Sequence, residues 1–420
     1  MNIFVSGVNY KTTPLETREN LSFTIEEQKK ALEEIRKLPG VDECAILSTC
    51  NRTEAYVYSE DRDFNNDVVE RLLCSLKGVC IYDMKKYFYV YSSTRAVKHL
   101  FKVACGMDSL VIGEDQILGQ VKGAYDLSLE MGSSRGVLNT LFREVITAAK
   151  KVKTFTGISR NNISVGSLAV KLVGDIFQGK LEDKCVLVIG TGKIGSLVLK
   201  NLSSRGFHKI YITNRTHGKT GELSKAYENV LPVSYNDRYS VIDECDVVIS
   251  STASPHYTIT RDMLEKSLAC GKERIFIDLA VPRDFDTAIK ELAGVRYFNI
   301  DDLQSVIGEN MDKRAVEMSR AEKIINEYVM EFEKWYEFRG VLPVVREIQK
   351  FTEEMLNEKI TRTLARLKCA SEEDRDIVKA SMTSTINEIL NKFIYSVREY
   401  ASKEDLETYF RCLGDAMKNE

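Results

Sequence analysis

Residues 185–195 read CVLVIGTGKIG. The opening apolar run, 185–189, is typical of a short parallel strand buried on both faces. Between a strand and a helix, the pattern GxGxxG binds a dinucleotide pyrophosphate, because glycines allow a tight turn and the helix N-terminus favours negative charge. The stretch therefore predicts a dinucleotide site, with a purely structural glycine turn as the alternative. The loop consists of Gly190, Thr191, Gly192, Lys193, Ile194 and Gly195.

Strands and helices alternate on both sides of this loop. Helical patterns cover 164–177, 194–204 and 219–227, and further strands are predicted at 209–213, 247–250, 275–278 and near 296–299. Short apolar strands that alternate with helices indicate a parallel sheet covered on both faces. We therefore expect a Rossmann-type, doubly wound α/β domain over residues 164–301.

The end of the second predicted strand distinguishes the two nicotinamide cofactors. NAD-binding domains carry Asp or Glu there, but this chain reads Asn214-Arg215-Thr216. Arg215 can pair with a 2′-phosphate, so we expect NADPH rather than NADH, with an exposed loop arginine as the alternative. After a later strand, the small residues Ser251 and Thr252 would let a nicotinamide ribose approach.

The segments before and after this domain differ from it. Residues 1–155 give the order β-α-β-β-α-β, which indicates a ferredoxin-like α+β unit, followed by helices. Thr24 is the expected N-cap of the first long helix, 25–38. From 302 onward the strands stop, and a helix to about 338 precedes two more helical stretches after Gly340 and Pro343. So extended a helical arm has little core of its own, and we expect it to form a dimer.

Composition excludes several classes of protein. The formal net charge of −3 argues against bulk nucleic-acid binding, although not against recognition of one folded RNA. No stretch approaches the roughly 18 apolar residues that span a bilayer, and the N-terminus lacks the features of a signal peptide, so we expect a cytoplasmic protein without a membrane contact. The 10 cysteines are scattered without a CxxC pair and His is present only 4 times, which predicts no disulfide framework and no metal site. Most of the cysteines should be buried.

Cys50 differs from the other cysteines in its setting. It lies between two predicted strands in the polar segment STCNRTE, residues 48–54. Thiolate chemistry needs access and a lowered pKa, and a neighbouring arginine together with turn amides can provide both. An inert turn cysteine is the alternative, and spacing alone leaves a Rossmann oxidoreductase of unknown substrate.

Several motifs resemble those of one family. STCNRTE at 48–54 resembles the active-site motif of the glutamyl-tRNA reductases, and HLFKVACGMDSLVIGEDQILGQVKGAY at 99–125 is similar to that family's second signature. Shorter matches lie in the same order along the chain: PLE at 14–16, RE at 18–19, GIS at 157–159, GTGKIG at 190–195 and IDLAVPRDFD at 277–286. The resemblance implies a homodimer with a catalytic domain (1–155), an NADPH domain (164–301) and a helical dimerisation domain (302–420) that begins with a long spinal helix.

The resemblance also implies a reaction. Cys50 would attack the aminoacyl ester of glutamyl-tRNA, and NADPH would reduce the resulting thioester to glutamate-1-semialdehyde, the first step of the five-carbon route to tetrapyrroles such as haem. Hydride must then cross between two domains, so we expect a hinge near Gly157. A channelling contact with glutamate-1-semialdehyde aminotransferase, which receives the unstable aldehyde, is a further implication.

Site residues are carried over position by position. Thr49, Asn51 and Arg52 would flank the substrate, with Arg52 pairing the glutamate side-chain carboxylate as an arginine fork does well. Glu114 would accept hydrogen bonds from the α-ammonium. His99 matches a histidine implicated in activity, with a satisfied core residue as its alternative. The other matched substrate positions, for which helix capping or simple exposure is the alternative, are Ser109, Asp115, Gln116 and Gln120.

Two other functions stay open at this point. A shikimate-dehydrogenase-like reductase of a small carbonyl compound would fit the Rossmann region but leaves STCNRTE unexplained. A non-catalytic protein that has kept the fold would have to retain Cys50 and Arg52 beside an intact glycine loop. Dependence of turnover on charged tRNA and on Cys50 separates the three hypotheses.

Overall fold

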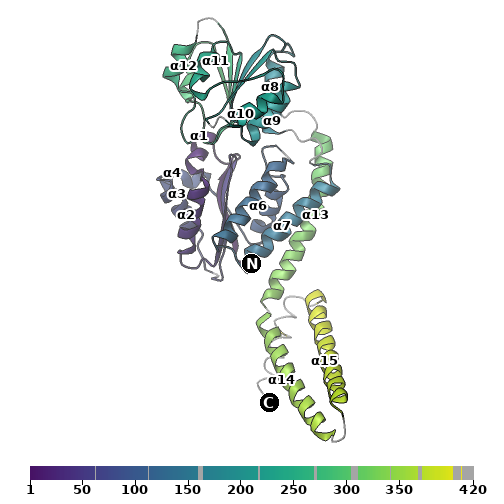
Figure 1. Ribbon diagram of the computed structural model, residues 1–420. Coiled ribbons are helices and arrows are strands. Elements are labelled where there is room, and N and C mark those ends of the chain that lie inside the picture. The colour runs from purple at the N-terminus through teal and green to yellow at the C-terminus, as the bar shows by residue number, and fades with distance from the viewer. Residues whose placement is uncertain are drawn as a thin grey trace. The chain divides into compact units, whose positions relative to one another are not determined.

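The computed structural model (Figure 1) describes residues 1–61, 63–111, 113–158, 164–215, 218–268, 272–303, 311–340, 342–367, 371–400 and 408. The chain divides into two compact units, Met1–Tyr328 and Val329–Glu420. Both predicted sheets lie in the first unit, and the second unit is helical.

The N-terminal sheet has the order β2-β3-β1-β4, and each strand is antiparallel to its neighbours. The strands are β1 (Ile3–Asn9), β2 (Glu43–Ser48), β3 (Arg52–Tyr58) and β4 (Tyr89–Ser92). Helices α2 (Ile25–Arg36) and α3 (Asp67–Leu76) make the two crossovers. This is the predicted ferredoxin-like arrangement. The short helices α1 (Leu15–Arg18) and α4 (Ile81–Met84) were not predicted, because single turns carry too little periodicity.

Two carboxylates fix the ends of helices in this part. The Thr24 hydroxyl accepts a hydrogen bond from the Glu27 backbone N–H, and the Glu27 carboxylate accepts one from Thr24, so the predicted cap of α2 is confirmed as a capping box. Glu43, in β2, accepts hydrogen bonds from the backbone N–H groups of Arg135, Val137 and Leu138 at 2.8 Å each. These groups open α7 (Gly136–Phe155), and a carboxylate satisfies them while it complements the helix dipole. The strand that leads into the Cys50 turn is thereby anchored.

Helices cover both faces of the sheet. Figure 1 shows α2 and α3 on one face, and α6 (Asp115–Glu130) and α7 on the other, where α5 (Ser93–Ala104) also contacts β1. The first part of α13 (Met311–Arg339) joins the second group of helices. Glu322 on α13 lies 3.4 Å from the Lys98 ammonium and 3.2 Å from that of Lys102, and Glu317 accepts a hydrogen bond of 2.6 Å from the Gly157 N–H. These contacts place α13 up to Tyr328 in the first compact unit.

The second sheet has the order β10-β9-β8-β5-β6-β7, with all neighbours parallel. Counted along the chain, this is the order 6-5-4-1-2-3 of a doubly wound dinucleotide-binding domain, as predicted. Its strands are β5 (Cys185–Ile189), β6 (Lys209–Thr213), β7 (Val230–Pro232), β8 (Val247–Ser250), β9 (Arg274–Asp278) and β10 (Val295–Asn299). Its helices are α8 (Val165–Ile176), α9 (Lys193–Ser203), α10 (Gly218–Lys225), α11 (Arg238–Ile242) and α12 (Arg261–Ser267).

The C-terminal unit contains the end of α13, α14 (Leu342–Arg366) and α15 (Glu372–Tyr400), and α14 packs against α15. The helices break at the predicted place, and Pro343 lies in the first turn of α14, where proline is tolerated. Large apolar side chains stay exposed on this unit, among them Ile377 and Ile389 at 60% each and Tyr395 at 62%. Such an exposed apolar surface indicates a protein contact.

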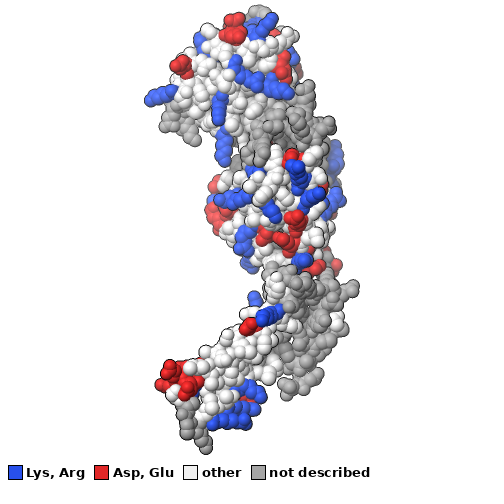
Figure 2. Space-filling view, turned by 90° about the vertical axis from the view of Figure 1, so that its right-hand side faces the viewer, with Lys and Arg blue, Asp and Glu red and all other residues white. Residues whose placement is uncertain are grey.

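The charged surface is mixed. Figure 2 shows blue Lys and Arg interspersed with red Asp and Glu over the described residues of one face. This pattern accords with the small net charge of −3. None of the helices within the described ranges is long and apolar enough to cross a membrane.

Candidate functional site

The turn between β2 and β3 presents Cys50. The Thr49 backbone N–H donates to the Arg52 carbonyl at 2.8 Å, and the Thr49 hydroxyl accepts from the N–H groups of Asn51 (3.2 Å) and Arg52 (3.1 Å). These bonds close a tight loop at the end of the hairpin. Three backbone amides, those of Thr49, Asn51 and Arg52, are therefore used to hold the turn, and among the turn's amides only the N–H of Cys50 itself acts on the thiol.

A small cavity brings most of the predicted substrate residues together. Its volume is about 20 Å³, which is room for about one water molecule. Its lining residues are Thr49, Cys50, Asn51, Arg52, Ser109, Glu114, Gln116, Ile117, Gln120, Val165 and Ile194. Of these, Val165 on α8 and Ile194 on α9 come from the dinucleotide domain. The candidate nucleophile and the glycine-loop helix thus meet at one cavity.

Residue Cys50 is half-buried, and the electrostatic setting of its thiol differs from the one we predicted. Burial, and secondarily the Glu114 carboxylate, raise the pKa of the Cys50 thiol from 9.0 to about 12, against a lowering by the Arg18 guanidinium. Arg52 was expected to lower this pKa, but its side chain pairs elsewhere. The expectation of a lowered pKa is therefore wrong for this arrangement, because α8 and α9 cover the turn and Glu114 adds a negative charge.

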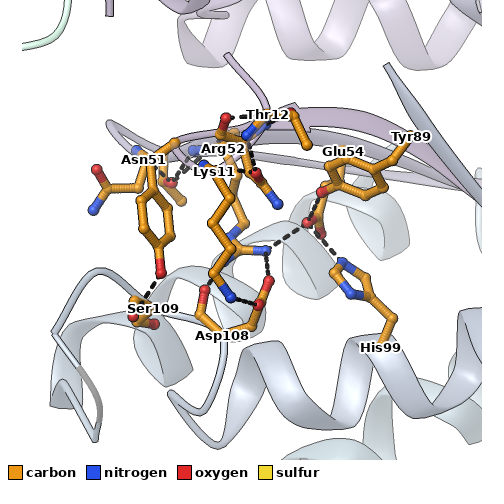
Figure 3. Close-up of polar contacts among 12 residues, drawn as sticks. Lys11, Thr12, Asn51, Arg52, Glu54, Tyr89, His99, Asp108 and Ser109 are labelled. Atoms are coloured by element: carbon orange, nitrogen blue, oxygen red, sulfur yellow. Dashed lines mark hydrogen bonds and ion pairs between the residues drawn. The ribbon is translucent and has the colours of Figure 1, made fainter. Parts of the chain in front are cut away.

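Arg52 is 1% exposed and belongs to a buried ion-pair network (Figure 3). Its Nη1 donates to Glu54 Oε1 at 2.6 Å and to Asp108 Oδ2 at 3.1 Å, and its Nη2 donates to the Asp108 carbonyl. Lys11 also pairs with Asp108. Burial alone would raise the pKa of Glu54, but the guanidinium of Arg52 and the neighbouring His99 hold that pKa well below its ordinary 4.5. The network keeps Glu54 ionised and Arg52 fixed.

His99, on α5, lies behind Arg52 and is not among the residues that line the cavity. Its Nε2 is 2.9 Å from Glu54 Oε1, and its ring packs edge-on against Tyr89 and Tyr91 at centroid distances of 5.5 and 5.1 Å. Tyr89 donates to the same Glu54 carboxylate, as Figure 3 shows. The structure thus places His99 where it orients Glu54, and not at the thiol.

The polar side chain of Asn51 lines the cavity with hydrogen-bonding capacity left. Asn51 is 8% exposed, and its Oδ1 finds no hydrogen-bond partner within the described part of the chain. Ser109 is 6% exposed, and its carbonyl accepts from the Tyr10 hydroxyl at 3.1 Å. A buried, unpaired carbonyl oxygen is costly, so the Asn51 amide suits a donor on a ligand. Asp115 begins α6 beside these residues, and its side chain lies outside the described set.

The glycine loop has the geometry that a pyrophosphate requires. Gly190 has φ +106°, a conformation open to glycine, and an added Cβ on Gly195 would lie 2.0 Å from the Gly190 carbonyl oxygen. An added Cβ on Gly192, in contrast, meets open space. The first and third glycines therefore serve the turn and the helix–strand contact, while the second leaves room for the cofactor. Lys193 and Ile194 start α9, and Thr191 is buried beside them.

The loop after β8 contains Ser251 and Thr252, which were predicted to lie beside the nicotinamide ribose of a dinucleotide. The Ser251 hydroxyl, next to Gly195, has no hydrogen-bond partner among the described residues. Asp284 accepts from the Ser250 hydroxyl at 2.6 Å and from the N–H of Thr252 at 2.7 Å, and it also pairs with the Thr252 hydroxyl. This carboxylate fixes the loop and leaves Ser251 for a ligand. The residues present therefore fit a bound dinucleotide.

The predicted 2′-phosphate residues follow β6. Arg215 is exposed, and its guanidinium carbon lies 5.7 Å from the centre of the Tyr235 ring. Asn214 is half-buried at the end of the strand. Thr216 lies outside the described residues. The exposed guanidinium is placed where an adenosine ribose would lie at the strand's carboxyl end.

The chain is similar over almost its whole length to known proteins of one family. A glutamyl-tRNA reductase from Carboxydothermus hydrogenoformans is 39% identical over 402 residues, which cover 96% of this chain and 89% of that protein. The chain belongs to the glutamyl-tRNA reductase family. Another glutamyl-tRNA reductase, from Heliobacterium mobile, is 37% identical over 415 residues, or 98% of this chain and 93% of that protein.

Family models match three consecutive parts of the chain. They are described as the N-terminal domain of glutamyl-tRNAGlu reductase (residues 6–156), shikimate/quinate 5-dehydrogenase (171–306) and the dimerisation domain of glutamyl-tRNAGlu reductase (320–417). The central match agrees with the nicotinamide-dinucleotide fold described above. Among solved structures, a glutamyl-tRNA reductase from Methanopyrus kandleri is 28% identical, covers 100% of this chain and 99% of its own, and gives a TM-score of 0.49.

Some residues of this family member's site were not assigned from the sequence. Arg18 is 1% exposed and donates through Nε to the Cys50 carbonyl at 3.2 Å. Glu54, Asp108 and Lys11 complete the Arg52 network. Arg18, Glu54 and Asp108 lie inside motifs that resemble those of the family, and this position was the sequence feature that could have identified them. Their roles depend on burial and partners that the sequence does not display.

Proposed function

We propose that this chain is an NADPH-dependent reductase that converts glutamyl-tRNA to glutamate-1-semialdehyde through a thioester on Cys50. The observation that carries the proposal is the cavity shared by Cys50 and Ile194, because it brings the nucleophile to the helix that begins at the dinucleotide loop. A covalent acyl intermediate and a hydride donor both need such a meeting point.

The first half-reaction transfers the glutamyl group. The Cys50 sulfur attacks the ester carbonyl, the bond to the tRNA 3′-terminal oxygen breaks, and that oxygen leaves with the proton that the thiol gives up. The product is a thioester, whose carbonyl is more electrophilic than that of the ester. Asn51 and Ser109 line the cavity and supply polar contacts to the acyl group.

Through the Glu114 carboxylate, binding of the substrate could activate the Cys50 thiol. Burial is the larger cause of the raised pKa of Cys50, and the charge of Glu114 adds to it. The α-ammonium of the glutamyl group, when paired with Glu114, would cancel that negative charge and favour the thiolate. Glu114 would thus both bind the substrate and make the thiol's reactivity depend on the substrate.

Arg52 is proposed to receive the substrate's side-chain carboxylate. Its Nη1 and Nη2 atoms already donate to Glu54 and Asp108, so the incoming carboxylate would take the place of Asp108, which is less buried than Glu54. Glu54 and His99 would stay in place and hold the guanidinium plane. This exchange of one carboxylate for another leaves the buried charge unchanged.

The second half-reaction reduces the thioester. NADPH, when bound to the glycine loop, supplies the hydride to the thioester carbonyl. The carbonyl oxygen would then carry a negative charge; as its C=O bond re-forms, the bond from carbon to the Cys50 sulfur breaks, and the sulfur takes one proton from solvent, which frees the aldehyde and restores the thiol. Arg215 would pair with the 2′-phosphate and so favour NADPH over NADH. A cavity of about 20 Å³ admits neither reactant as it stands, so Val165 and Ile194 would have to move away and return.

The assembly follows from the same family. We propose a homodimer formed through the helical region, with functional divisions at 1–155, 164–301 and 302–420. The exposed apolar residues of α15 support this proposal. Transfer of the aldehyde to glutamate-1-semialdehyde aminotransferase, and a cytoplasmic location, belong to the same proposal.

Trapping of the acyl-enzyme tests the proposed function. The protein is mixed with glutamyl-tRNA without NADPH, quenched in acid and analysed by intact-mass and peptide mass spectrometry. A glutamyl adduct on the Cys50 peptide is expected in the wild type and not in Cys50→Ser. If the wild type carries no adduct but oxidises NADPH with a small carbonyl compound, the shikimate-dehydrogenase-like alternative is favoured.

A further inference from the structure

Two adjacent residues, Arg18 and Glu19, connect the catalytic domain to the dinucleotide domain at separate points, and Arg18 also contacts the Cys50 turn. Arg18 donates through Nε to the Cys50 carbonyl at 3.2 Å and through Nη2 to Asp301 at 2.9 Å, just beyond β10. Its Nη1 donates to the Thr13 carbonyl at 2.9 Å. The buried guanidinium therefore joins the backbone of the nucleophile to the end of the second sheet.

Glu19 makes the second connection, to Arg283. Its carboxylate accepts from Arg283 Nε at 3.1 and 3.0 Å, from Nη2 at 2.5 Å, and from the Arg283 backbone N–H at 3.2 Å. The side chains are only 10% (Arg283) and 15% (Glu19) exposed. A fork-to-carboxylate pair of this kind is directional as well as strong.

Arg283 is joined to the cofactor side by its neighbour in sequence. Asp284 holds Ser250 and Thr252, the residues that flank Ser251. Asp278, at the end of β9, in turn accepts from the Asp284 backbone N–H at 2.9 Å. A displacement of Arg283 would therefore also displace Asp284 and, through it, the loop where the nicotinamide end of a dinucleotide would lie.

The Glu19–Arg283 pair joins the two domains at the edge of a cavity and does not lie inside a packed core. A cavity of about 630 Å³ lies beside Glu19 and Arg283, with Lys77 and Val79 on one wall and Tyr257 among the residues of the other. Apolar contact between the two domains comes instead from Leu15, Leu110 and Val111, which share a core cluster with residues of the dinucleotide domain. Loss of the pair should therefore change how the domains meet more than it changes how either one folds.

We propose that Arg18 and Glu19 form a clamp that holds the dinucleotide domain closed on Cys50, and so positions the thioester for hydride transfer. The proposal rests on the proposed function and adds two positioning residues to it. Acyl transfer needs the small Cys50 cavity to open, whereas reduction needs it to close. The two half-reactions should therefore respond differently to loss of the clamp.

The test separates these half-reactions in the full-length protein. Without NADPH, release of uncharged tRNA reports the first half-reaction, because the ester bond to tRNA breaks when the thioester forms. NADPH oxidation reports both half-reactions. In Glu19→Gln and Arg283→Gln, NADPH oxidation at saturating substrate should fall about 10- to 100-fold, while release of uncharged tRNA without NADPH should not fall, because the cavity opens at least as often as in the wild type. The double variant Glu19→Arg with Arg283→Glu should recover part of the lost reduction.

A second readout needs no substrate. Alkylation of Cys50 by iodoacetamide should be faster in Glu19→Gln than in the wild type, because the cavity opens more often. Arg261→Gln is the matched control, since Arg261 pairs with Glu291 within the dinucleotide domain, and it should leave both readouts unchanged. Equal loss of both half-reactions, unchanged rates in all variants, or a double variant no better than the single ones would overturn the clamp. A wild type that neither deacylates glutamyl-tRNA nor oxidises NADPH overturns the proposed function instead, and the alkylation rates then still decide whether the clamp exists.

Discussion

Replacement of Glu54 by Gln removes one charge from the buried network behind Cys50. Glu54 is fully buried, and its two oxygens contact Arg52 (2.6 Å), His99 (2.9 Å), Tyr56 (2.5 Å) and Tyr89. In the variant, the Arg52 guanidinium stays buried with Asp108 as its one carboxylate among the described partners. Removing one partner of a buried ion pair costs about 3–5 kcal/mol.

This cost should appear as lower thermal stability. For a domain of this size, about 2–4 °C of melting temperature correspond to each kcal/mol, so Glu54→Gln should melt about 6–20 °C below the wild type. Differential scanning calorimetry at neutral pH measures the difference. The matched control is Glu34→Gln, whose ion pair with Lys37 lies on the surface and should leave the melting temperature unchanged.

The effect has a definite dependence on pH. The pKa of Glu54 in the folded protein lies below its ordinary 4.5. The stabilisation is therefore fully present above about 4.5 and is lost as pH falls toward the folded value. The difference between wild type and Glu54→Gln should shrink in acid. A variant that melts within about 2 °C of the wild type at neutral pH would refute the reasoning, because that is the range of a surface substitution.

Four further substitutions probe the reactive thiol and the cofactor site. Glu114→Gln removes the charge that helps to raise the Cys50 pKa, so iodoacetamide should alkylate Cys50 about 3- to 10-fold faster at neutral pH, as peptide mass spectrometry can follow, and an unchanged rate would contradict the assigned cause. Arg215→Gln should raise the KM for NADPH about tenfold and leave that for NADH unchanged; a parallel rise for both would remove Arg215 from the 2′-phosphate. Gly192→Ala and Gly195→Ala should both abolish binding of NADPH in calorimetric titration, but only Gly195→Ala should lower the melting temperature, because its Cβ would lie 2.0 Å from a backbone oxygen while that of Gly192 meets open space.

The fold was predictable where the sequence carries long or strongly patterned signals. The apolar β5 and the glycine loop that follows specified the doubly wound domain, and Thr24 marked the start of α2. Strand β7 was missed because it has three residues and ends in Pro232, which leaves almost no alternation to detect. The compact first unit also extends to Tyr328, beyond the predicted start of the helical domain, because α13 pairs with residues of α5 and α7.

The sequence predicted which residues form the site, but it did not predict their ion-pair partners or the direction in which the Cys50 pKa is shifted. The motif around Cys50 and the helix that begins at Asp115 both appeared in the sequence, and eight of the ten catalytic and substrate residues named there line one cavity. Adjacency in sequence suggested that Arg52 would face the thiol. Its actual partner, Asp108, is 56 residues away, and the contact of Arg18 with Asp301 joins positions 283 residues apart. Such pairings, and the burial that raises the Cys50 pKa, arise only when the domains pack.

The distribution of cysteines followed the prediction in the described part of the chain. Cys44, Cys74, Cys105, Cys185 and Cys245 are buried there, Cys80 is exposed and Cys50 is intermediate. Cys270, Cys369 and Cys412 lie outside the described residues. A half-buried cysteine that lines a cavity is thus distinguishable from the structural ones by its position.

Cys50 is proposed to carry the glutamyl group from tRNA to the hydride donor. The most direct measurement is NADPH oxidation by the purified protein and by Cys50→Ser, with glutamyl-tRNA as substrate and with free glutamate and uncharged tRNA as controls. We predict turnover with the charged tRNA alone, and none in the variant. Turnover that persists without Cys50, or that needs no tRNA, would contradict the thioester mechanism.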